Sequence, residues 1–293
     1  MKVIDRIRDE ALSLSFEVFP PKSGAAFDGV MGAAAEIARL RPSYISVTYG
    51  AGGAGSRYTA EIARRLQQTE DVPVLAHLTC VGADRETIRA YLKTLREDGI
   101  CNVMALRGDL PEGMTPDTMR DCPYPHASDL IREIRQGGDL CIGAACYPEI
   151  HPESANQQQD LRSLREKVEA GADFLTTQMF FDNDVFYNFM YKLREAGITV
   201  PVVPGIMPIT GANQVVRAQK LSGCFMPRRF ISLVDRFGSS PEAMQQAGIL
   251  YAADQIIDLF ANGIRHVHIY TMNKPDVAAA IQRRLSRMLG RVF

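Results

Sequence analysis

Short apolar runs alternate along the whole chain with longer stretches of helical periodicity. The runs are rich in Val, Ile, Leu and aromatic residues and are too short for helices, which favours β-strands. The predicted strands cover residues 14–19, 44–49, 73–80, 101–106, 140–147, 173–178, 199–207 and 266–271.

The stretches between these runs place apolar residues three and four positions apart, as amphipathic helices do. Asp84 stands where an N-cap is expected, and Gly99, Gly171 and Gly197 follow the ends of three helices. Two or three further helices are predicted between residues 211 and 263. The other predicted helices cover residues 25–40, 58–67, 85–97, 128–135, 158–170, 184–196 and 275–289.

The regular alternation of strand and helix determines the expected fold. Eight strands that each lead into a helix are typical of a closed parallel (β/α)₈ barrel, the TIM barrel. A doubly wound open sheet is the competing arrangement. No linker or low-complexity segment divides the 293 residues, a length that such barrels commonly have. We therefore predict a single α/β domain over residues 1–293.

The composition narrows the class of protein. Hydrophobic residues make up 46% of the chain and charged residues 23%, which is ordinary for a globular protein with a sizeable core. A formal net charge of −1 without a basic block gives no electrostatic case for nucleic acid. No apolar run approaches the ~20 residues of a membrane span, and no secretion signal begins the chain. These features predict a cytoplasmic protein without a membrane partner.

The chain offers little for metal or imine chemistry. The six cysteines form no Cys-x-x-Cys pair and are expected to be buried thiols. His266 and His268 alternate on one strand and suit a metal in spacing, but they begin the strand and no acids join them, so core histidines are favoured. The strands contain no lysine for a Schiff base. Lys22 and Lys274 follow strand ends and suit an anionic ligand tail.

Glu17 is the most informative polar residue because it lies between Phe16 and Val18 in an apolar run. A carboxylate there is costly unless it is paired or protonated. One interpretation is a structural ion pair, for instance with Arg107. The favoured one is a general acid whose pKa is raised by desolvation. Other polar residues follow the strands, where barrels carry catalytic groups: Thr48, Tyr49, His77, Thr79, Asp109, Tyr147, Glu149, His151, Thr177, Gln178, Gln214, Tyr270, Thr271 and Asn273.

Two other patterns have alternative interpretations. Arg107-Gly108-Asp109 either forms a surface turn or places a cation and an anion at the barrel mouth, and its position after a strand favours the second. His77 is equally compatible with the core and with the site.

Residues 50–55 fit the glycine pattern of a dinucleotide-binding loop, but any run of small residues does so. The acid that should end the next strand is missing, so a loop that lets a ligand come close is favoured over a Rossmann domain. One buried acid with amides, hydroxyls and tyrosines suits a planar heteroaromatic ligand.

With these residues the chain resembles the methylenetetrahydrofolate reductases, the flavoproteins of folate one-carbon metabolism. The resemblance extends from residue 16 to about 275 and is to the catalytic barrel of bacterial-type members, so no regulatory domain is expected. The motifs are FEVFPPK at 16–22, SVTYGA at 46–51, HLTC at 77–80, ALRGDLP at 105–111, ASDL at 127–130, YPEIHPE at 147–153, TQMFFD at 177–182, PGIMP at 204–208 and YTMN at 270–273.

The resemblance implies FAD as cofactor and NADH or NADPH as electron donor. Glu17 matches the acid that protonates the folate so that its five-membered ring opens to an iminium, and Asp109 matches a carboxylate between flavin and pterin. Gln178, Gln214 and Lys274 match folate contacts, and Thr48 matches a residue at the nicotinamide site. The cofactor-binding set implied in this way is Thr48, Tyr49, Ala51, His77, Arg107, Gly108, Asp109, Ala127, Tyr147, His151, Ser154, Asp160 and Lys167.

Three positions depart from the family pattern. Lys274 stands where an arginine is common, which removes a bidentate contact to the folate. Ser154 replaces a small apolar residue, and Glu166 stands where a basic FAD contact is usual. These departures concern the cofactor tail and the folate rather than the chemistry.

The implied reaction is a ping-pong pair of half-reactions that ends in 5-methyltetrahydrofolate. The sequence does not choose between NADH and NADPH, and a partner protein could supply the electrons instead. The resemblance also implies a homo-oligomer. Alternatives are a flavin barrel of the proline dehydrogenase type, a non-redox barrel that binds a pterin or a corrinoid methyl carrier, and a metal hydrolase using His266 and His268.

Overall fold

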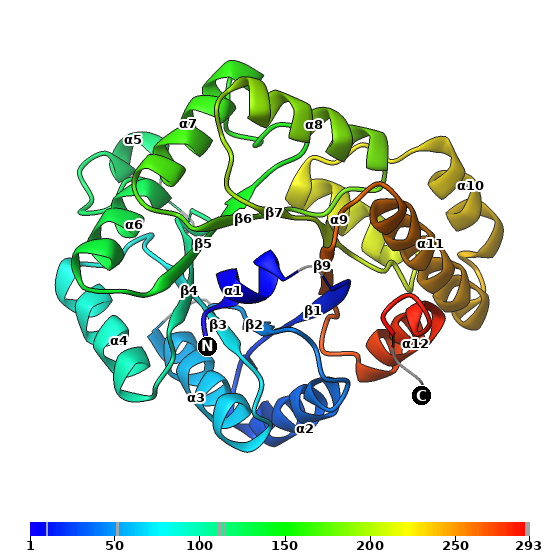
Figure 1. Cartoon of the computed structure of the whole chain (residues 1–293), viewed down its shortest axis with the longest axis horizontal. Coiled ribbons are helices and arrows are strands. Elements are labelled where there is room, and N and C mark those ends of the chain that lie inside the picture. The colour runs from blue at the N-terminus through cyan, green and yellow to red at the C-terminus, as the bar shows by residue number, and fades with distance from the viewer. Residues whose placement is uncertain (10, 51–52, 111–112, 114, 291–293) are drawn as a thin grey trace.

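The protein, described here by a computed structural model, is a parallel barrel surrounded by helices (Figure 1). The structure describes residues 1–9, 11–50, 53–110, 113 and 115–290. The strands run in the order β7-β6-β5-β4-β3-β2-β1-β9-β8, and every pair is parallel, which confirms the predicted TIM barrel. Their bounds are β1 Ser13–Val18, β2 Ile45–Val47, β3 Val74–Thr79, β4 Asn102–Leu106, β5 Cys141–Cys146, β6 Phe174–Thr177, β7 Val202–Val203, β8 Gly205–Ile206 and β9 His266–Tyr270.

The segment predicted as one strand over 199–207 closes the barrel in two short pieces. β7 pairs with β6, and β8 pairs with β9. Pro204 separates the pieces because it has no N–H to donate to a ladder. Its carbonyl still accepts a hydrogen bond from the His268 N–H at 2.9 Å. A side chain at Gly205 would collide with the Tyr270 hydroxyl, so this closing strand requires glycine.

The helices follow the predicted periodicity closely. The Asp84 carboxylate accepts from the Thr87 N–H at 2.7 Å, which confirms the predicted cap. Gly99, Gly171 and Gly197 adopt positive φ angles of 76°, 117° and 74°, as glycines after helix ends do. Residues 211–263 hold three helices. The bounds are α2 Phe27–Ala38, α3 Gly53–Thr69, α4 Arg85–Glu97, α6 Ala127–Gln136, α7 Gln157–Glu169, α8 Asn183–Glu195, α9 Asn213–Ser222, α10 Arg228–Phe237, α11 Pro241–Ala261 and α12 Pro275–Leu285.

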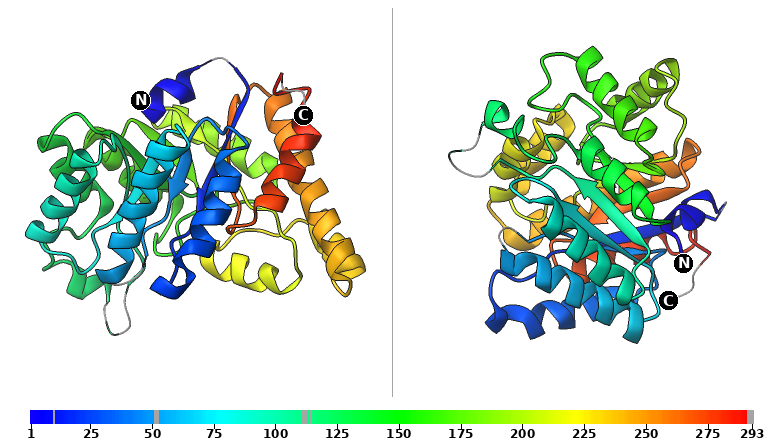
Figure 2. Two further views of the ribbon diagram at one scale, coloured as in Figure 1. Left: turned by 90° about the horizontal axis from the view of Figure 1, so that it is seen from below. Right: turned by 90° about the vertical axis from the view of Figure 1, so that its left-hand side faces the viewer.

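An unpredicted helix, α1 (Val3–Arg8), covers the end of the barrel where the strands begin. Figure 1 looks onto this helix in the centre of the barrel, and Figure 2 shows it at the end opposite α9. Val3, Ile4 and Ile7 are buried and pack into the barrel interior against Tyr44, Leu75, Met104, Phe174 and Val203. The short helices η1 (Gly24–Ala26) and α5 (Pro116–Met119) were not predicted either. The strand ends opposite α1 therefore remain for the site.

The prediction that all six cysteines are buried thiols is confirmed only in part. All six cysteines are free, and Cys80, Cys141, Cys146 and Cys224 are buried, whereas the other two are partly exposed. Within the described residues, no helix is long and apolar enough to cross a membrane.

Candidate active site

Glu17 lies on β1 near the strand's carboxyl end and is only 6% exposed. The Ser46 hydroxyl donates to its Oε2 at 3.4 Å, and His77 Nε2 lies 3.6 Å from the same oxygen. Burial raises the pKa of Glu17, and the nearby His77 and Ser46 oppose this only in part. This carboxyl is therefore placed to hold a proton inside the barrel.

His77 on β3 is the neighbour that decides the charge of the pair. Burial lowers the pKa of His77 to about 4, although the carboxyl of Glu17 acts in the opposite direction. A neutral imidazole cannot form a strong ion pair with Glu17, so it does not force the carboxyl to ionise. His77 is thus buried and also lies beside Glu17. It is a core residue and a site residue at once, the two roles that the sequence left open.

Arg107, the ion-pair partner considered for Glu17, is bound elsewhere. Its Nη1 and Nη2 atoms each lie 2.6 Å from a carboxylate oxygen of Glu153. The alternative interpretation of a structural ion pair between Arg107 and Glu17 is therefore wrong, because the guanidinium extends along the rim toward the loop after β5. Gly108 has a φ of 92°, and a Cβ there would lie 2.8 Å from Val81 Cγ1. Asp109 follows on the exposed side of the mouth.

The ends of β5 and β6 bring three predicted ligand contacts together. Tyr147 and His151 meet edge to face with ring centroids 4.6 Å apart. Burial raises the pKa of Tyr147 and lowers that of His151. The Gln178 side chain lies within hydrogen-bonding reach of Tyr147 and acts to lower the pKa of that phenol. The Oε1 atom of Gln178 also accepts a hydrogen bond from the Met179 N–H at 2.9 Å.

Lys167 on α7 is a half-buried cation close to this group. Its Nζ donates to the Ala145 carbonyl at 2.9 Å. Burial lowers the pKa of Lys167, and the carboxyl of Asp160 acts against that shift. Asp160 is also buried, its pKa is raised by desolvation, and the Ser154 hydroxyl lies 3.3 Å from it. Ser154 therefore contacts the carboxylate that accompanies Lys167. Glu166 precedes Lys167 on the same helix.

Gln214 and Lys274, both predicted folate contacts, share a partner across the mouth. Gln214 Oε1 accepts from the backbone N–H groups of Thr210 and Gly211 at 2.8 and 3.0 Å. Lys274 Nζ donates to Thr210 Oγ1 at 2.9 Å. Thr210 thereby links the start of α9 with the segment that follows β9 through hydrogen bonds to Gln214 and Lys274.

The remaining predicted positions lie around the same rim. Thr48 follows β2, and its carbonyl accepts from the Thr59 hydroxyl at 2.8 Å. Tyr49 meets Tyr91 edge to face at 5.5 Å. Ala127 is the first residue of α6 and is buried. Ala51, together with part of the glycine-rich stretch 50–55, lies outside the described residues.

His266 and His268 are buried and bond to serines rather than to a metal. His266 Nδ1 lies 2.6 Å from Ser13 Oγ, and His268 Nδ1 lies 2.7 Å from Ser15 Oγ. Among the described residues, no group of three His, Cys, Asp or Glu side chains is arranged to hold a metal ion. The geometry agrees with the core interpretation of this pair, not with a hydrolase centre.

Several residues that position Glu17 were missed or left without a role by sequence reasoning. The Thr271 hydroxyl donates to the Glu17 carbonyl at 2.6 Å. Asn273, at a φ of 56°, accepts from the Phe19 N–H and donates to its carbonyl at 2.8 and 2.9 Å. Ser15 alternates with Glu17 along β1, and that two-residue spacing was the one available signal that both face the interior.

The fold and the site together place the protein among the (β/α)₈-barrel enzymes that hold a buried acid at the carboxyl ends of their strands. The family model of methylenetetrahydrofolate reductase matches residues 2–286. The chain belongs to the methylenetetrahydrofolate reductase family, which confirms the resemblance seen in the motifs.

The chain aligns with about half the length of some relatives and with most of the length of others. It is 35% identical to methylenetetrahydrofolate reductase (NADH) 1 of Zea mays, over 97% of this chain but 51% of the relative, so it spans about half the length of that protein. It is 33% identical to 5,10-methylenetetrahydrofolate reductase of Pectobacterium carotovorum subsp. carotovorum, over 92% of this chain and 89% of the relative. The corresponding Escherichia coli (strain K12) enzyme is 31% identical at the same coverage.

One solved structure shares the fold across nearly its whole length. It is an uncharacterized protein from Clostridium thermocellum that binds two copies of 5-methyl-5,6,7,8-tetrahydrofolic acid. The TM-score is 0.63, the identity is 13%, and the match covers 98% of this chain and 97% of that one. At this identity the likeness shows the barrel fold alone.

Proposed function

We propose that the protein reduces 5,10-methylenetetrahydrofolate to 5-methyltetrahydrofolate, with FAD as cofactor and NADH or NADPH as electron donor in a ping-pong reaction. Membership in the reductase family supports the reduction of methylenetetrahydrofolate. The observation that carries the proposal is Glu17 at the carboxyl ends of the strands, a buried carboxyl whose pKa is raised by desolvation.

Glu17 is proposed as the proton donor to the folate. Ring opening of the substrate requires a proton on a nitrogen, and a carboxyl is a useful acid only if it keeps its proton near neutral pH. Desolvation raises the pKa of Glu17 in that direction, and the neutral state of His77 does not counteract it with a full charge. Asp109, exposed on the rim, is proposed to contact both ligands.

The residues at the ends of β4 and β5 fit the charge of FAD. Lys167 is a half-buried cation whose desolvation Asp160 offsets only in part, and an anionic pyrophosphate would offset it further. Arg107 offers a fork of donors, which Glu153 occupies in this structure. Tyr147 and His151 present ring surfaces beside them. When bound, FAD would supply the redox chemistry of the reaction.

Gln178, Gln214 and Lys274 are proposed to bind the folate. Amides suit the ring edges of a pterin, and Lys274 suits the anionic tail. The Clostridium thermocellum protein of the same fold binds a methyltetrahydrofolate, which makes a folate site on this barrel plausible. The maize relative is an NADH enzyme, so NADH is the first donor to test.

An absorbance spectrum of the purified protein tests the proposal. The chain has no tryptophan, so a flavin would be easy to see. We expect a yellow protein that NADH or NADPH bleaches under anaerobic conditions and that methylenetetrahydrofolate reoxidises. A protein that stays colourless and takes up no FAD would overturn the proposal, and bleaching without reoxidation would indicate another flavin enzyme.

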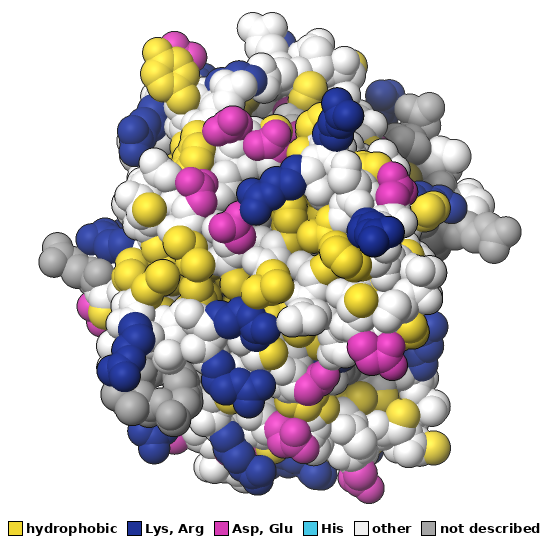
Figure 3. Space-filling view, turned by 90° about the vertical axis from the view of Figure 1, so that its right-hand side faces the viewer, with side chains coloured by type: hydrophobic (Ala, Val, Ile, Leu, Met, Phe, Trp, Pro, Cys, Tyr) yellow, Lys and Arg dark blue, Asp and Glu magenta, His cyan; other side chains and the backbone are white. Residues whose placement is uncertain are grey.

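The cytoplasmic location, predicted from the lack of targeting and membrane segments, and the homo-oligomer, implied by the family resemblance, both remain predictions. Figure 3 shows the face that carries α10, α11 and α12, where apolar side chains gather between charged ones. Phe237, Leu250 and Ile257 are 42%, 49% and 37% exposed on these helices and offer a surface for a second copy. Light scattering of the protein in solution would measure its oligomeric state.

A further inference from the structure

One side of the barrel interior is polar, although barrels of this class usually fill the interior with bulky branched residues. β1, β2 and β9 contribute Ser15, Ser46, His266 and His268, which are 0%, 1%, 5% and 2% exposed. The opposite side is mostly apolar and belongs to the cluster that α1 covers, with Asn102 and Thr176 as its buried polar residues. Polar groups buried at this depth need hydrogen-bond partners, and these residues find them in one another.

The contacts begin at Glu17 and lead away from the mouth. Ser46 Oγ lies 3.4 Å from Glu17 Oε2 and 3.1 Å from His268 Nε2. The other nitrogen of that ring, His268 Nδ1, lies 2.7 Å from Ser15 Oγ. A hydroxyl and an imidazole thus connect the acid to the middle of the barrel.

The series continues to the far end of the barrel. Ser15 Oγ lies 3.1 Å from His266 Nε2, and His266 Nδ1 lies 2.6 Å from Ser13 Oγ. Both imidazoles are therefore bridged at both nitrogens. We call Ser13, His266, Ser15, His268 and Ser46 the serine–histidine relay. It joins the active-site acid to the first residue of β1 without a gap.

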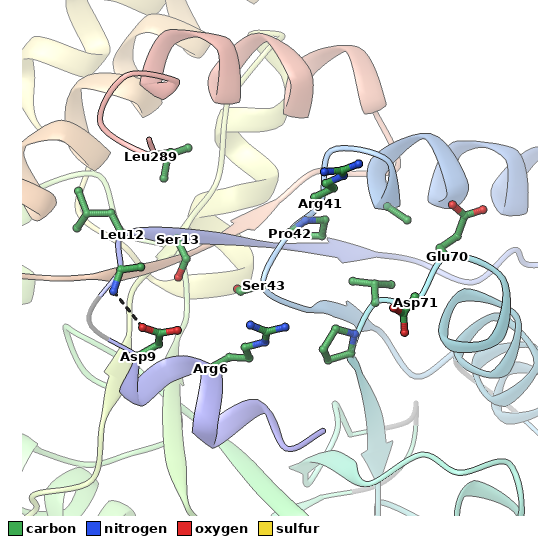
Figure 4. Close-up of a pocket in the computed structure, with 14 residues that line it drawn as sticks. Arg6, Asp9, Leu12, Ser13, Arg41, Pro42, Ser43, Glu70, Asp71 and Leu289 are labelled. Atoms are coloured by element: carbon green, nitrogen blue, oxygen red, sulfur yellow. Dashed lines mark hydrogen bonds between the residues drawn. The ribbon is translucent and has the colours of Figure 1, made fainter. Parts of the chain in front are cut away.

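Ser13 lines a cavity of about 490 Å³ at the end of the barrel where the strands begin. Figure 4 shows Ser13 and Ser43 beside α1, with Arg6, Arg41 and Asp71 around the same space. The charged lining favours water. Ser43 Oγ also lies 3.4 Å from His266 Nε2, which gives the relay a second contact with this cavity.

The two imidazoles are held in parallel planes and stay neutral. The Tyr44 ring stacks on His266 and His268 at 5.3 and 5.6 Å, with interplanar angles of 8° and 13°. Burial lowers the pKa of each histidine to about 3. A neutral ring accepts a proton on one nitrogen and releases another from the opposite one, and a low pKa keeps it from retaining the charge.

We propose that the serine–histidine relay returns a proton to Glu17 from the cavity beside α1. The inference rests on the proposed function, in which each turnover removes one proton from Glu17. The folate occupies the mouth at that moment, so a path through the barrel reaches the acid from the side that the substrate does not cover.

The transfer balances atom by atom. Ser46 gives its hydroxyl proton to the Glu17 carboxylate and takes one from His268 Nε2, while His268 Nδ1 takes one from Ser15. Ser15 then takes the proton of His266 Nε2.

His266 Nδ1 completes the transfer by taking a proton from Ser13, which takes one from water in the cavity. One proton moves from solvent to Glu17, and no residue keeps an extra one. Both imidazoles change from the Nε2–H to the Nδ1–H tautomer. Before the relay carries a second proton, both rings return to Nε2–H and the serine hydroxyls reorient.

The first test measures those tautomers by NMR of protein with ¹⁵N-labelled histidine, over a pH titration. Both rings should be Nδ1–H at low pH, where Glu17 is protonated, and should switch together to Nε2–H as Glu17 ionises. The charged and titratable groups that face Glu17 are His77 from β3, Tyr44 just before β2, and His268 and Tyr270 from β9. His77 has its own signal, and E17Q should abolish the joint switch. Opposite tautomers in the two rings, or a switch that persists in E17Q, would overturn the relay.

The second test separates the first turnover from later ones in stopped-flow measurements on the reduced enzyme. S13A and H266N should keep the first folate reduction within about twofold, because Glu17 starts protonated. Later turnovers should slow by roughly tenfold or more, within the range of acid–base contributions. T176V, which alters a buried hydroxyl outside the relay, should behave as the wild type. Equal loss of first and later turnovers would indicate a merely structural role, and no loss would show that the proton enters by the mouth. A wild type without folate reduction would instead refute the proposed function and leave the tautomer test standing.

Discussion

At the scale of single residues, the surroundings of Glu17 matter more than its identity. The carboxyl is buried, meets one hydroxyl at 3.4 Å and lies 3.6 Å from an imidazole that is neutral near neutral pH. Arg107, the strong cation that could have fixed its charge, is bound to Glu153. Glu17 is therefore free to hold its proton, which is the property that the proposed reaction requires.

Replacing Glu17 by Gln should separate the two half-reactions. E17Q keeps the shape and the polarity of the site, so the protein should still bind FAD and be bleached by NADH or NADPH. Reduction of the folate should fall by at least about a hundredfold, the lower end of general-acid contributions. E149Q is the matched control, since Glu149 also has a pKa raised by burial but bonds to the Phe225 N–H. Comparable folate turnover in E17Q would remove Glu17 from its role.

The same substitution should also change how stability depends on pH. The pKa of Glu17 is raised in the folded protein, from 4.5 in the unfolded chain. Above pH 4.5 the unfolded chain releases a proton that the folded protein retains, so the wild type loses stability as pH rises toward the folded pKa. E17Q does not ionise and should be the more stable protein at neutral pH. Urea unfolding at several pH values would measure this, and the advantage should vanish below pH 4.5. A constant difference across that range would contradict the raised pKa.

At the scale of elements, the loops and helices after the strands bring distant residues to one rim. α7 supplies Lys167, which reaches the Ala145 carbonyl of β5 at 2.9 Å. The start of α9 and the end of β9 meet through Thr210. The turn after β4 depends on Gly108, because any side chain there would collide with Val81. These elements are positioned by the barrel, so the rim needs little ordering when ligands bind.

Replacing Lys167 by Met should weaken FAD binding without harming the fold. The variant loses one charge-assisted contact worth about 1.5–3 kcal/mol, which corresponds to roughly a tenfold or greater rise in Kd. The protein without cofactor should be less stable than the wild type, because the buried Asp160 loses its neighbouring cation and the Ala145 carbonyl loses its donor. K93M removes an exposed lysine of α4 and should change neither quantity. Flavin fluorescence titrations and thermal unfolding would measure both, and an unchanged Kd in K167M would exclude this lysine from the cofactor site.

At the scale of the whole molecule, the two ends of the barrel have different roles. The ends where the strands finish carry the candidate site, while α1 covers the other end with Val3, Ile4 and Ile7. The cavity beside α1 remains the opening at that end through which solvent meets the relay. The apolar face of α1 therefore contributes to the stability of the barrel without lining the candidate ligand site.

Truncating the apolar face of α1 should destabilise the protein and leave its ligands in place. Ile7 is 7% exposed, and I7A should lower the free energy of unfolding by about 2–5 kcal/mol, as buried Ile→Ala changes do. I257A, at a position that is 37% exposed on α11, is the control and should cost far less. Denaturant unfolding gives both values, and FAD affinity should match the wild type. A loss of FAD binding in I7A at temperatures where it stays folded would show that the two ends are coupled.

The sequence by itself determined the barrel, because each strand and helix has its own local periodicity and its own caps, and α4 begins and ends where predicted. It also determined which residues follow the strands, and motifs at those positions identified the family. Only the tertiary structure decided which of these side chains meet. In the structure Arg107 forms its ion pair with Glu153 instead of Glu17. The closing strand is interrupted at Pro204, and α1 packs across the end of the barrel. Ser13 and His266 lie 253 positions apart, and such contacts follow from barrel register, which no local pattern encodes.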